Sequence, residues 1–218
     1  MIRLILLFLI STSSAFAESV VIGMDKEKVA ITATFDGSQI LLFGAVKRDK
    51  PAPIGDLQVI VTVAGPSERI SVHRKSKVLG IWMNTETVEV DAAPSFYAVA
   101  TSSNFLSTIS DTEDLRYKVS IPRAIRSVGA PMNVLDAVSF SEAVIRIRKE
   151  QGLYKLLENT VEIDEQTLFR TSIGMPADIS EGDYTARILL TRNGNVIDEF
   201  STVTVSYTHL TLPTILLV

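Results

Sequence analysis

Apolar and polar residues alternate along most of the chain with the period of two that is typical of half-buried β-strands. The clearest alternation is in residues 28–35 and 57–63, and residues 40–43 are apolar on both faces, which predicts a central strand covered on both sides. Asp36-Gly37 and Asn193-Gly194 are hairpin-turn signals. Further strands are predicted at residues 40–46, 70–74, 78–83, 87–90, 96–101, 160–163, 167–173, 184–192 and 196–203.

The middle of the chain has a different pattern. Ser110-x-x-Glu113 and Ser139-x-x-Glu142 are capping boxes, in which a serine side chain accepts hydrogen bonds from the first free N–H groups of a helix. After the second box the apolar residues fall near one helical face, so a helix is predicted over residues 140–158, with Gly152 as its weak point.

These elements predict a mainly β protein built from immunoglobulin-like β-sandwich modules with a helical insertion in the middle of the chain. We divide it into an N-terminal sandwich module (18–102), a helical or irregular insertion (103–158) and a C-terminal β segment (159–203) that completes a second sandwich. Four strands are few for a separate sandwich, so this last segment needs a strand from residues 115–121 or packs on the first half. Gly182-Asp183-Tyr184 resembles the tyrosine corner of such sandwiches.

The N-terminus has the features of a secretory signal peptide, predicted over residues 1–17. Arg3 supplies the positive charge, residues 4–10 are apolar, and Ala15-Phe16-Ala17 fits the small-x-small cleavage pattern. We therefore expect an exported protein that begins at Glu18 and works in the periplasm.

The C-terminus has a different origin. Residues 205–214 match the translation of a transposase adapter used in shotgun sequencing, so residues 204–218 are predicted to be a non-native tail. His209 lies in this tail, which leaves His73 as the one native histidine.

The composition limits the kinds of catalysis and metal binding that we expect of the chain. The chain has no cysteine, which removes thiol nucleophiles and cysteine-bound metals. His73 lies in a basic strand segment, where an exposed histidine is expected, so we predict no enzyme, no metal and no cofactor. The net charge of −4 becomes −5 without residues 1–17, which argues against a nucleic-acid partner.

One group of residues has the composition of a binding surface. Aromatic residues and arginines are enriched at protein interfaces, and the candidate patch consists of Trp82, Asn84, Phe96, Tyr97, Arg123 and Arg126. The alternative is that the aromatic residues belong to the core and that the arginines pair with nearby acids.

Three segments carry a family resemblance. Residues 80–84 (Gly-Ile-Trp-Met-Asn), 90–102 and 121–129 resemble the Alph_Pro_TM family of alphaproteobacterial transmembrane proteins, and the likeness extends over residues 18–203. The resemblance implies an exported domain followed by one C-terminal membrane helix, which this chain lacks because the tail begins there. It implies no established activity, but it associates the family with membrane sulfite exporters.

The leading hypothesis is therefore a non-enzymatic, membrane-tethered periplasmic module that binds or assists an envelope protein, such as a transporter of the sulfite-exporter type. One alternative is a periplasmic enzyme that uses carboxylates alone. Another is a structural module that joins other chains by strand addition at a sheet edge.

Overall fold

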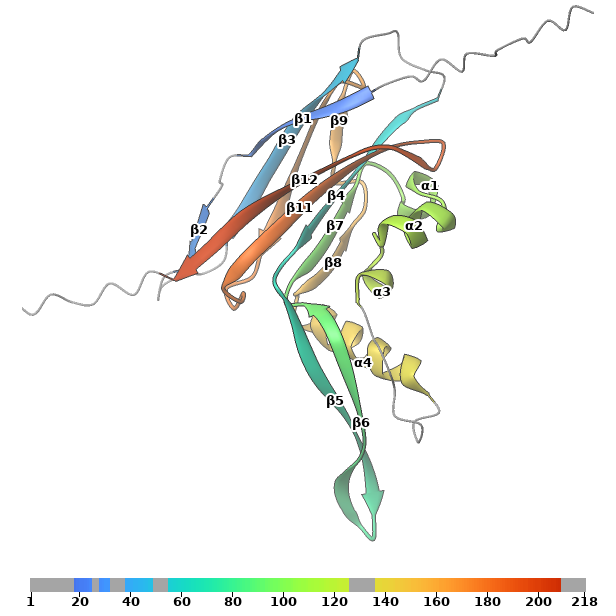
Figure 1. Cartoon of the computed structure of the whole chain (residues 1–218), viewed down its shortest axis with the longest axis vertical. Helices are drawn as coiled ribbons and strands as arrows, with labels where there is room; N and C mark the ends of the chain where they lie inside the picture. Colours follow the sequence, from blue (N-terminus) through green and yellow to red (C-terminus); the bar gives the residue numbers. More distant parts are fainter. Residues whose placement is uncertain (1–17, 25–27, 32–37, 49–54, 126–135, 209–218) are drawn as a thin grey trace, which may run out of the picture.

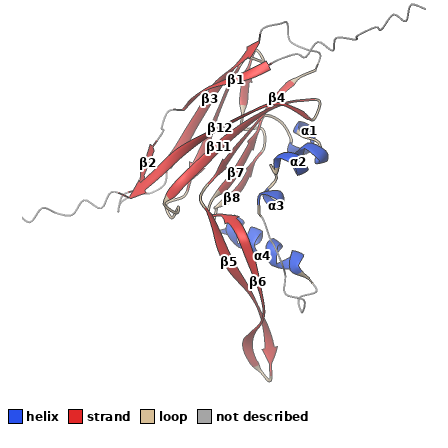
Figure 2. Cartoon of the chain, in the orientation of Figure 1, coloured by secondary structure: helices blue, strands red, loops and turns tan. Residues whose placement is uncertain are grey.

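The predicted strands assemble into two packed β-sheets, from which one long hairpin projects (Figures 1 and 2). The computed structural model describes residues 18–24, 28–31, 38–48, 55–125 and 136–208. The predicted signal peptide, the predicted Asp36-Gly37 turn, Arg126 and residues 209–218 lie outside the described residues, so the expectations for them stay predictions.

The described strands are β1 (Glu18–Met24), β2 (Lys28–Ile31), β3 (Ser38–Arg48), β4 (Leu57–Ala64), β5 (Ser67–Val78), β6 (Ile81–Pro94), β7 (Tyr97–Thr101), β8 (Tyr154–Leu157), β9 (Glu162–Asp164), β10 (Leu168–Met175), β11 (Gly182–Arg192) and β12 (Asn195–Thr208). The helices are α1 (Phe105–Thr108), α2 (Asp111–Tyr117), α3 (Ile121–Ala124) and α4 (Ala137–Glu150). The mainly β class and the helical insertion are confirmed.

The strands form a sandwich of a four-stranded and a six-stranded sheet. The smaller sheet has the order β1-β3-β10-β9 and the larger one β2-β12-β11-β4-β7-β8, while β5 and β6 pair only with each other. Neighbouring strands are antiparallel except in the pairs β2–β12 and β7–β8. Buried side chains from both sheets, such as Leu42 and Ile188, belong to one continuous core.

The C-terminal segment does not complete a second sandwich, so that prediction is wrong. Strand β10 pairs with β3, and β11 pairs with β4, so the last segment packs on the first half, as the alternative expects, and both halves share the same two sheets. The pairing brings buried residues together, with Ile173 opposite Ile40 and Ile188 opposite Val61. Residues 115–121 add no strand, because most of them belong to helices α2 and α3.

Helices cover the outer side of the larger sheet beside β4 and β7 (Figure 1). Every residue of β7 is buried, and Tyr97 at its start donates a hydrogen bond to the Val119 carbonyl at 2.8 Å. The strand covered on both sides is therefore β7, and its neighbour β4 is nearly so. Strand β3, for which double coverage was predicted, has Leu41 and Phe43 exposed on its outward side.

Two local predictions are confirmed in detail. Asn193 and Gly194 have φ angles of 51° and 78°, as a tight turn between β11 and β12 requires. The Tyr184 hydroxyl donates a hydrogen bond to the Ser180 carbonyl at 2.7 Å, which is the contact that defines a tyrosine corner.

The projecting hairpin differs from the three short strands predicted over residues 70–90. Strands β5 and β6 run continuously to a two-residue turn formed by Leu79 and Gly80, with φ angles of 50° and 87°. Leucine is not a turn residue, so the sequence pattern hid the turn. A predicted strand at residues 78–83 crosses it and is wrong.

Helix α4 begins earlier and ends earlier than predicted. Asp136 is the N-cap and accepts a hydrogen bond from the Ser139 amide, so the second capping box does not form, whereas Ser110 caps α2 as predicted. The helix ends at Glu150, and Gly152 then takes a left-handed φ of 71° that turns the chain into β8.

Strand β12 extends into the predicted non-native tail. Its backbone continues to Thr208, and Ser206 lies opposite Gly182 of β11. Strand β2 pairs with residues 205–208, in parallel. We expected residues after Val203 to lie loose or to pair only by accident, and residues 205–208 do pair.

Candidate functional site

The predicted aromatic and arginine patch is not one surface. Trp82 and Asn84 are exposed near the end of the β5–β6 hairpin, whereas Phe96 and Tyr97 are buried in the core. Arg123 pairs with the buried Asp114 carboxylate at 2.8 Å, as the alternative expects. Of the predicted set, Trp82 and Asn84 alone remain on a free surface among the described residues.

The hairpin ends in an apolar group. We call β5 and β6 the arm, and residues 78–83 (Val-Leu-Gly-Ile-Trp-Met) the arm tip. All five side chains of the tip are exposed, with Leu79 at 99% and Trp82 at 67% of their full accessible area. Figure 1 shows the arm extending well beyond the sandwich, so the tip is the most distant described part of the fold on that side.

The two faces of the arm near its end carry different side chains. Lys77 lies opposite Trp82 and Lys75 opposite Asn84, so these four residues share one face. Val78 lies opposite Ile81 on the other face. The end of the ribbon is thus apolar on both sides, and the lysines stand on the face of the tryptophan.

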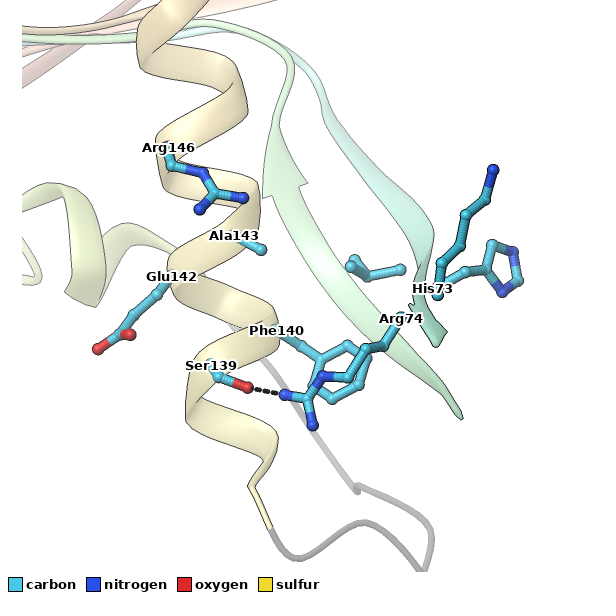
Figure 3. Close-up of a pocket in the computed structure, with 9 residues that line it drawn as sticks. His73, Arg74, Ser139, Phe140, Glu142, Ala143 and Arg146 are labelled. Atoms are coloured by element: carbon cyan, nitrogen blue, oxygen red, sulfur yellow. Dashed lines mark hydrogen bonds between the residues drawn. The ribbon is translucent and has the colours of Figure 1, made fainter. Parts of the chain in front are cut away.

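Arg74 fastens the arm to helix α4 (Figure 3). Its guanidinium lies 4.5 Å from the centre of the Phe140 ring and 2.9 Å from the Glu86 carboxylate, and it also donates a hydrogen bond to the Ser139 hydroxyl. Val88 of β6 packs with Phe140 in a small buried cluster beside this contact. The arm is therefore braced near its middle.

An open groove of about 640 Å³ lies between α4 and β5 beside this brace. Asp136, the N-cap of α4, is 3.6 Å from Arg74, and hydrogen bonds from Ser139, followed by the charge of Arg74, lower the pKa of the Asp136 carboxyl. Because Arg74 contacts Glu86, Asp136 and Ser139 together, its main role is to hold the arm and α4 in place.

A second apolar surface lies on the outward side of the smaller sheet. We define the outer face as Val21, Leu41, Phe43 and Leu168, all exposed. Val21 and Leu168 both lie opposite Ala45 of β3, so the three form one row across the sheet. A hollow of about 450 Å³ opens here, with Asp164 and Arg170 at its border.

The buried carboxylates have structural partners. Asp114 accepts hydrogen bonds from the Val119 and Ser120 amides at 3.1 and 2.7 Å, in addition to its ion pair with Arg123. Glu113 accepts a hydrogen bond from the Val196 amide at 3.3 Å. Both groups connect α2 to neighbouring segments.

Buried tyrosines show the largest changes in pKa. Burial raises the pKa of Tyr97 and that of Tyr154 to about 12, and the Tyr154 hydroxyl donates to the Pro94 carbonyl at 2.7 Å. These hydroxyls fasten the inserted helices and the base of the arm.

His73 is exposed on β5, as predicted, with its ring 2.8 Å from the Thr87 hydroxyl. Within the described ranges, the His, Asp and Glu side chains form no group of three or more that could hold a metal ion.

Most residues of both apolar surfaces were not predicted from the sequence. Leu79, Ile81 and Met83 were assigned to a strand, although an apolar run next to Gly80 and close to two lysines could have marked an exposed turn. Leu41 and Phe43 were assigned to a covered strand, and no feature of their own segment separates the two cases.

Comparison with curated proteins and solved structures assigns no activity to this chain. Curated proteins include no match to this chain. Among solved structures, the chain is similar to an enterococcal surface protein, partial N-terminal region, with 13% identity and a TM-score of 0.28 over 89% of this chain. The chain spans less than half (43%) of that structure, and we transfer no property from it.

A family model gives a clearer result. The match covers most of the sandwich, the arm and the inserted helices, which agrees with the resemblance found in residues 80–84, 90–102 and 121–129. None of the helices in the described part of the chain has the length and apolar character needed to cross a bilayer. With its match over residues 19–207, the chain belongs to the family described as "Putative transmembrane protein (Alph_Pro_TM)".

Proposed function

We propose that this protein is a non-enzymatic binding module that is tethered at the periplasmic side of the inner membrane and associates with an envelope protein through its outer face. The observation that carries the proposal is the exposure of Val21, Leu41, Phe43 and Leu168 on one side of one sheet.

An antiparallel sheet that faces water normally has polar residues on that side. On the outer face the central outward positions of β3 are Leu41, Phe43 and Ala45 instead. Ala45 lies between Val21 of β1 and Leu168 of β10, whereas the polar Arg170 and Ser172 of β10 lie opposite Phe43 and Leu41. Contiguous exposed apolar residues with a polar border are typical of protein interfaces. A partner that covers this face removes the apolar side chains from water.

Family membership supports a partner in the membrane. The predicted leader would direct export, and the C-terminal helix implied by the family resemblance would hold the exported domain beside other inner-membrane proteins. A tether raises the local concentration of the domain there, so even a modest interface is occupied. Among such proteins we propose a transporter of the sulfite-exporter type.

The two alternatives have weaker support. A carboxylate-only enzyme needs free carboxylates in a pocket, whereas the buried Glu113 and Asp114 have structural partners. Strand addition could use the edges of the arm, because β5 and β6 pair only with each other among the described residues. However, Lys75 and Lys77, together with two register shifts along the arm, are features that discourage edge pairing.

A crosslinking experiment tests the proposal. The complete, membrane-anchored protein carries a photoreactive phenylalanine analogue at position 43 and is irradiated in its native membranes. We expect a crosslink to a multi-span transporter, and Leu168→Thr should reduce its yield, because it removes a neighbouring apolar contact while keeping a residue that favours strands.

The matched control is Leu115, which is exposed on α2 outside the outer face. Leu115→Gln should leave the crosslink at position 43 unchanged. Equal yields from photoreactive groups at positions 43 and 115, or capture of soluble proteins only, would contradict the proposal.

A further inference from the structure

We infer that the arm tip inserts into the surface of a phospholipid bilayer that carries anionic headgroups. This inference is independent of the outer face, and it gives the domain a second contact, made with lipid.

The shape of the tip and its apolar side chains favour insertion into a bilayer. Leu79 is at the apex, and Ile81 and Trp82 each expose 67% of their area. Apolar side chains project from both faces of the ribbon, since Val78 and Ile81 share one face and Trp82 lies on the other. A bilayer that surrounds the tip buries the apolar side chains of both faces, whereas a flat protein surface covers the side chains of one face only.

Leu79 adds a second observation. Its φ of 50° is in the left-handed region, which leucine adopts less readily than glycine or asparagine. Neither packing nor solubility explains a strained leucine at the most exposed position of the tip. Contact with an apolar phase does explain it.

The charges near the tip favour anionic lipid. Residues 74–85 include Arg74, Lys75 and Lys77 but no aspartate or glutamate. Arg74 forms an ion pair with Glu86, whereas Lys75 and Lys77 form no ion pair within the described structure. Both lysines lie on the face of Trp82, so their ammonium groups can reach headgroup phosphates while the indole lies at the interface.

The geometry of the sandwich lets the tip reach a membrane. The arm starts at the end of β4, where Ala64 lies opposite Thr185 of β11. Strand β12 passes the same end of β11, where Ser206 lies opposite Gly182. The arm extends beyond this end of the sheet (Figure 1). With the Arg74 brace to hold it, the arm keeps its tip away from the sandwich.

The protein contains its own probe for the test, because Trp82 is the only tryptophan in the chain. The chain from Glu18 onward is titrated with vesicles of phosphatidylglycerol and phosphatidylcholine and, separately, with phosphatidylcholine alone. We expect a blue shift of Trp82 emission, and quenching by lipids brominated on their acyl chains, with the anionic vesicles and much less with the neutral ones.

Substitutions separate insertion from folding. Leu79→Asn should weaken vesicle binding roughly tenfold although it suits the turn better, so loss of folding cannot explain the effect. Lys75→Gln and Lys77→Gln should each weaken binding to anionic vesicles about fivefold, and salt should do the same. Leu115→Gln should change nothing, and every variant carries the same C-terminal tail.

Four results would overturn the inference. They are an unchanged emission spectrum with anionic vesicles, equal binding to neutral vesicles, equal losses for Leu79→Asn and Leu115→Gln, and a blue shift that appears only in native membranes with their proteins. The last result would assign the tip to a protein partner. Crosslinking from position 43 is a separate measurement, so failure here does not affect the outer face.

Discussion

At the scale of single residues, Leu79 stands where hairpin turns usually have asparagine or glycine. The Leu79-Gly80 turn has positive φ at both positions, and the branched side chain of leucine crowds the backbone in that conformation. We predict that Leu79→Asn stabilises the arm by about 1 kcal/mol, which is roughly fivefold slower hydrogen exchange of its amides. Exchange measured by NMR on both proteins checks this, and faster exchange in the variant would show that the turn is not strained.

Tyr97 connects a buried strand to the inserted helices through a single hydroxyl. Its pKa is raised from 10.0 to about 12, mainly because burial disfavours the charged phenolate. In the unfolded chain the phenol loses its proton near pH 10, while the native state keeps it. The free energy of unfolding therefore falls as the pH rises from about 10 to about 12.

We predict that Tyr97→Phe lowers the free energy of unfolding by about 1 kcal/mol at neutral pH, because the buried Val119 carbonyl loses its donor. Above pH 10 the difference from the native protein should shrink, since the variant has one phenol fewer to ionise. Urea unfolding at pH 7, 10 and 11 measures both effects. A gap that stays constant with pH would contradict the assigned pKa, whereas Tyr154 still supplies some alkaline sensitivity in either protein.

At the scale of elements, strand β2 depends on a segment of foreign origin by our interpretation. Its four residues pair with residues 205–208, all of which belong to the adapter match. We predict that deleting residues 206–218 leaves the thermal midpoint nearly unchanged, while amides of residues 29–31 exchange faster because they lose their partners, residues 206–208. A midpoint lower by many degrees would mean that β12 is native to its end.

The same elements show what sequence could and could not predict. Strands with clear alternation, such as β4, and turns with specific chemistry, such as Asn193-Gly194, were predicted from local sequence alone. The packing of the last segment on the first half was only one of two alternatives, because it depends on pairing between strands far apart in sequence.

The prediction of the candidate site was wrong for a related reason. Trp82 and Phe96 have similar apolar character, and only the tertiary fold makes one an exposed tip residue and the other a core residue. In the same way, Leu41 and Phe43 form an exposed surface because no described element covers β3 on that side, while the helices cover β7. Coverage is a property of the whole fold, and local sequence does not encode it.

At the scale of the whole molecule, the sandwich supports two apolar surfaces that belong to different sheets. The outer face lies on β1, β3 and β10, and the arm tip extends from the end of β4, which lies in the other sheet. Because their positions are set by different strand pairs, a partner on one surface leaves the other free. Under the two proposals, the module would contact a protein and a bilayer at once.

This separation leads to the last prediction. Residues 75–85 contain no core residue, and Arg74 lies directly opposite Glu86 just behind them. Replacing residues 75–85 with Asn-Gly should close the shortened arm in a tight turn and keep the Arg74 brace. We expect an unchanged thermal midpoint and an unchanged crosslink from position 43, with binding to anionic vesicles reduced at least tenfold.

Trp82 is lost with the tip, so vesicle flotation is the measurement of binding. The shortened protein also carries the apolar C-terminal tail, which makes it the direct control for any lipid binding by that tail. Full retention of flotation would assign lipid binding to another part of the chain, and loss of the crosslink would show that the two surfaces act as one.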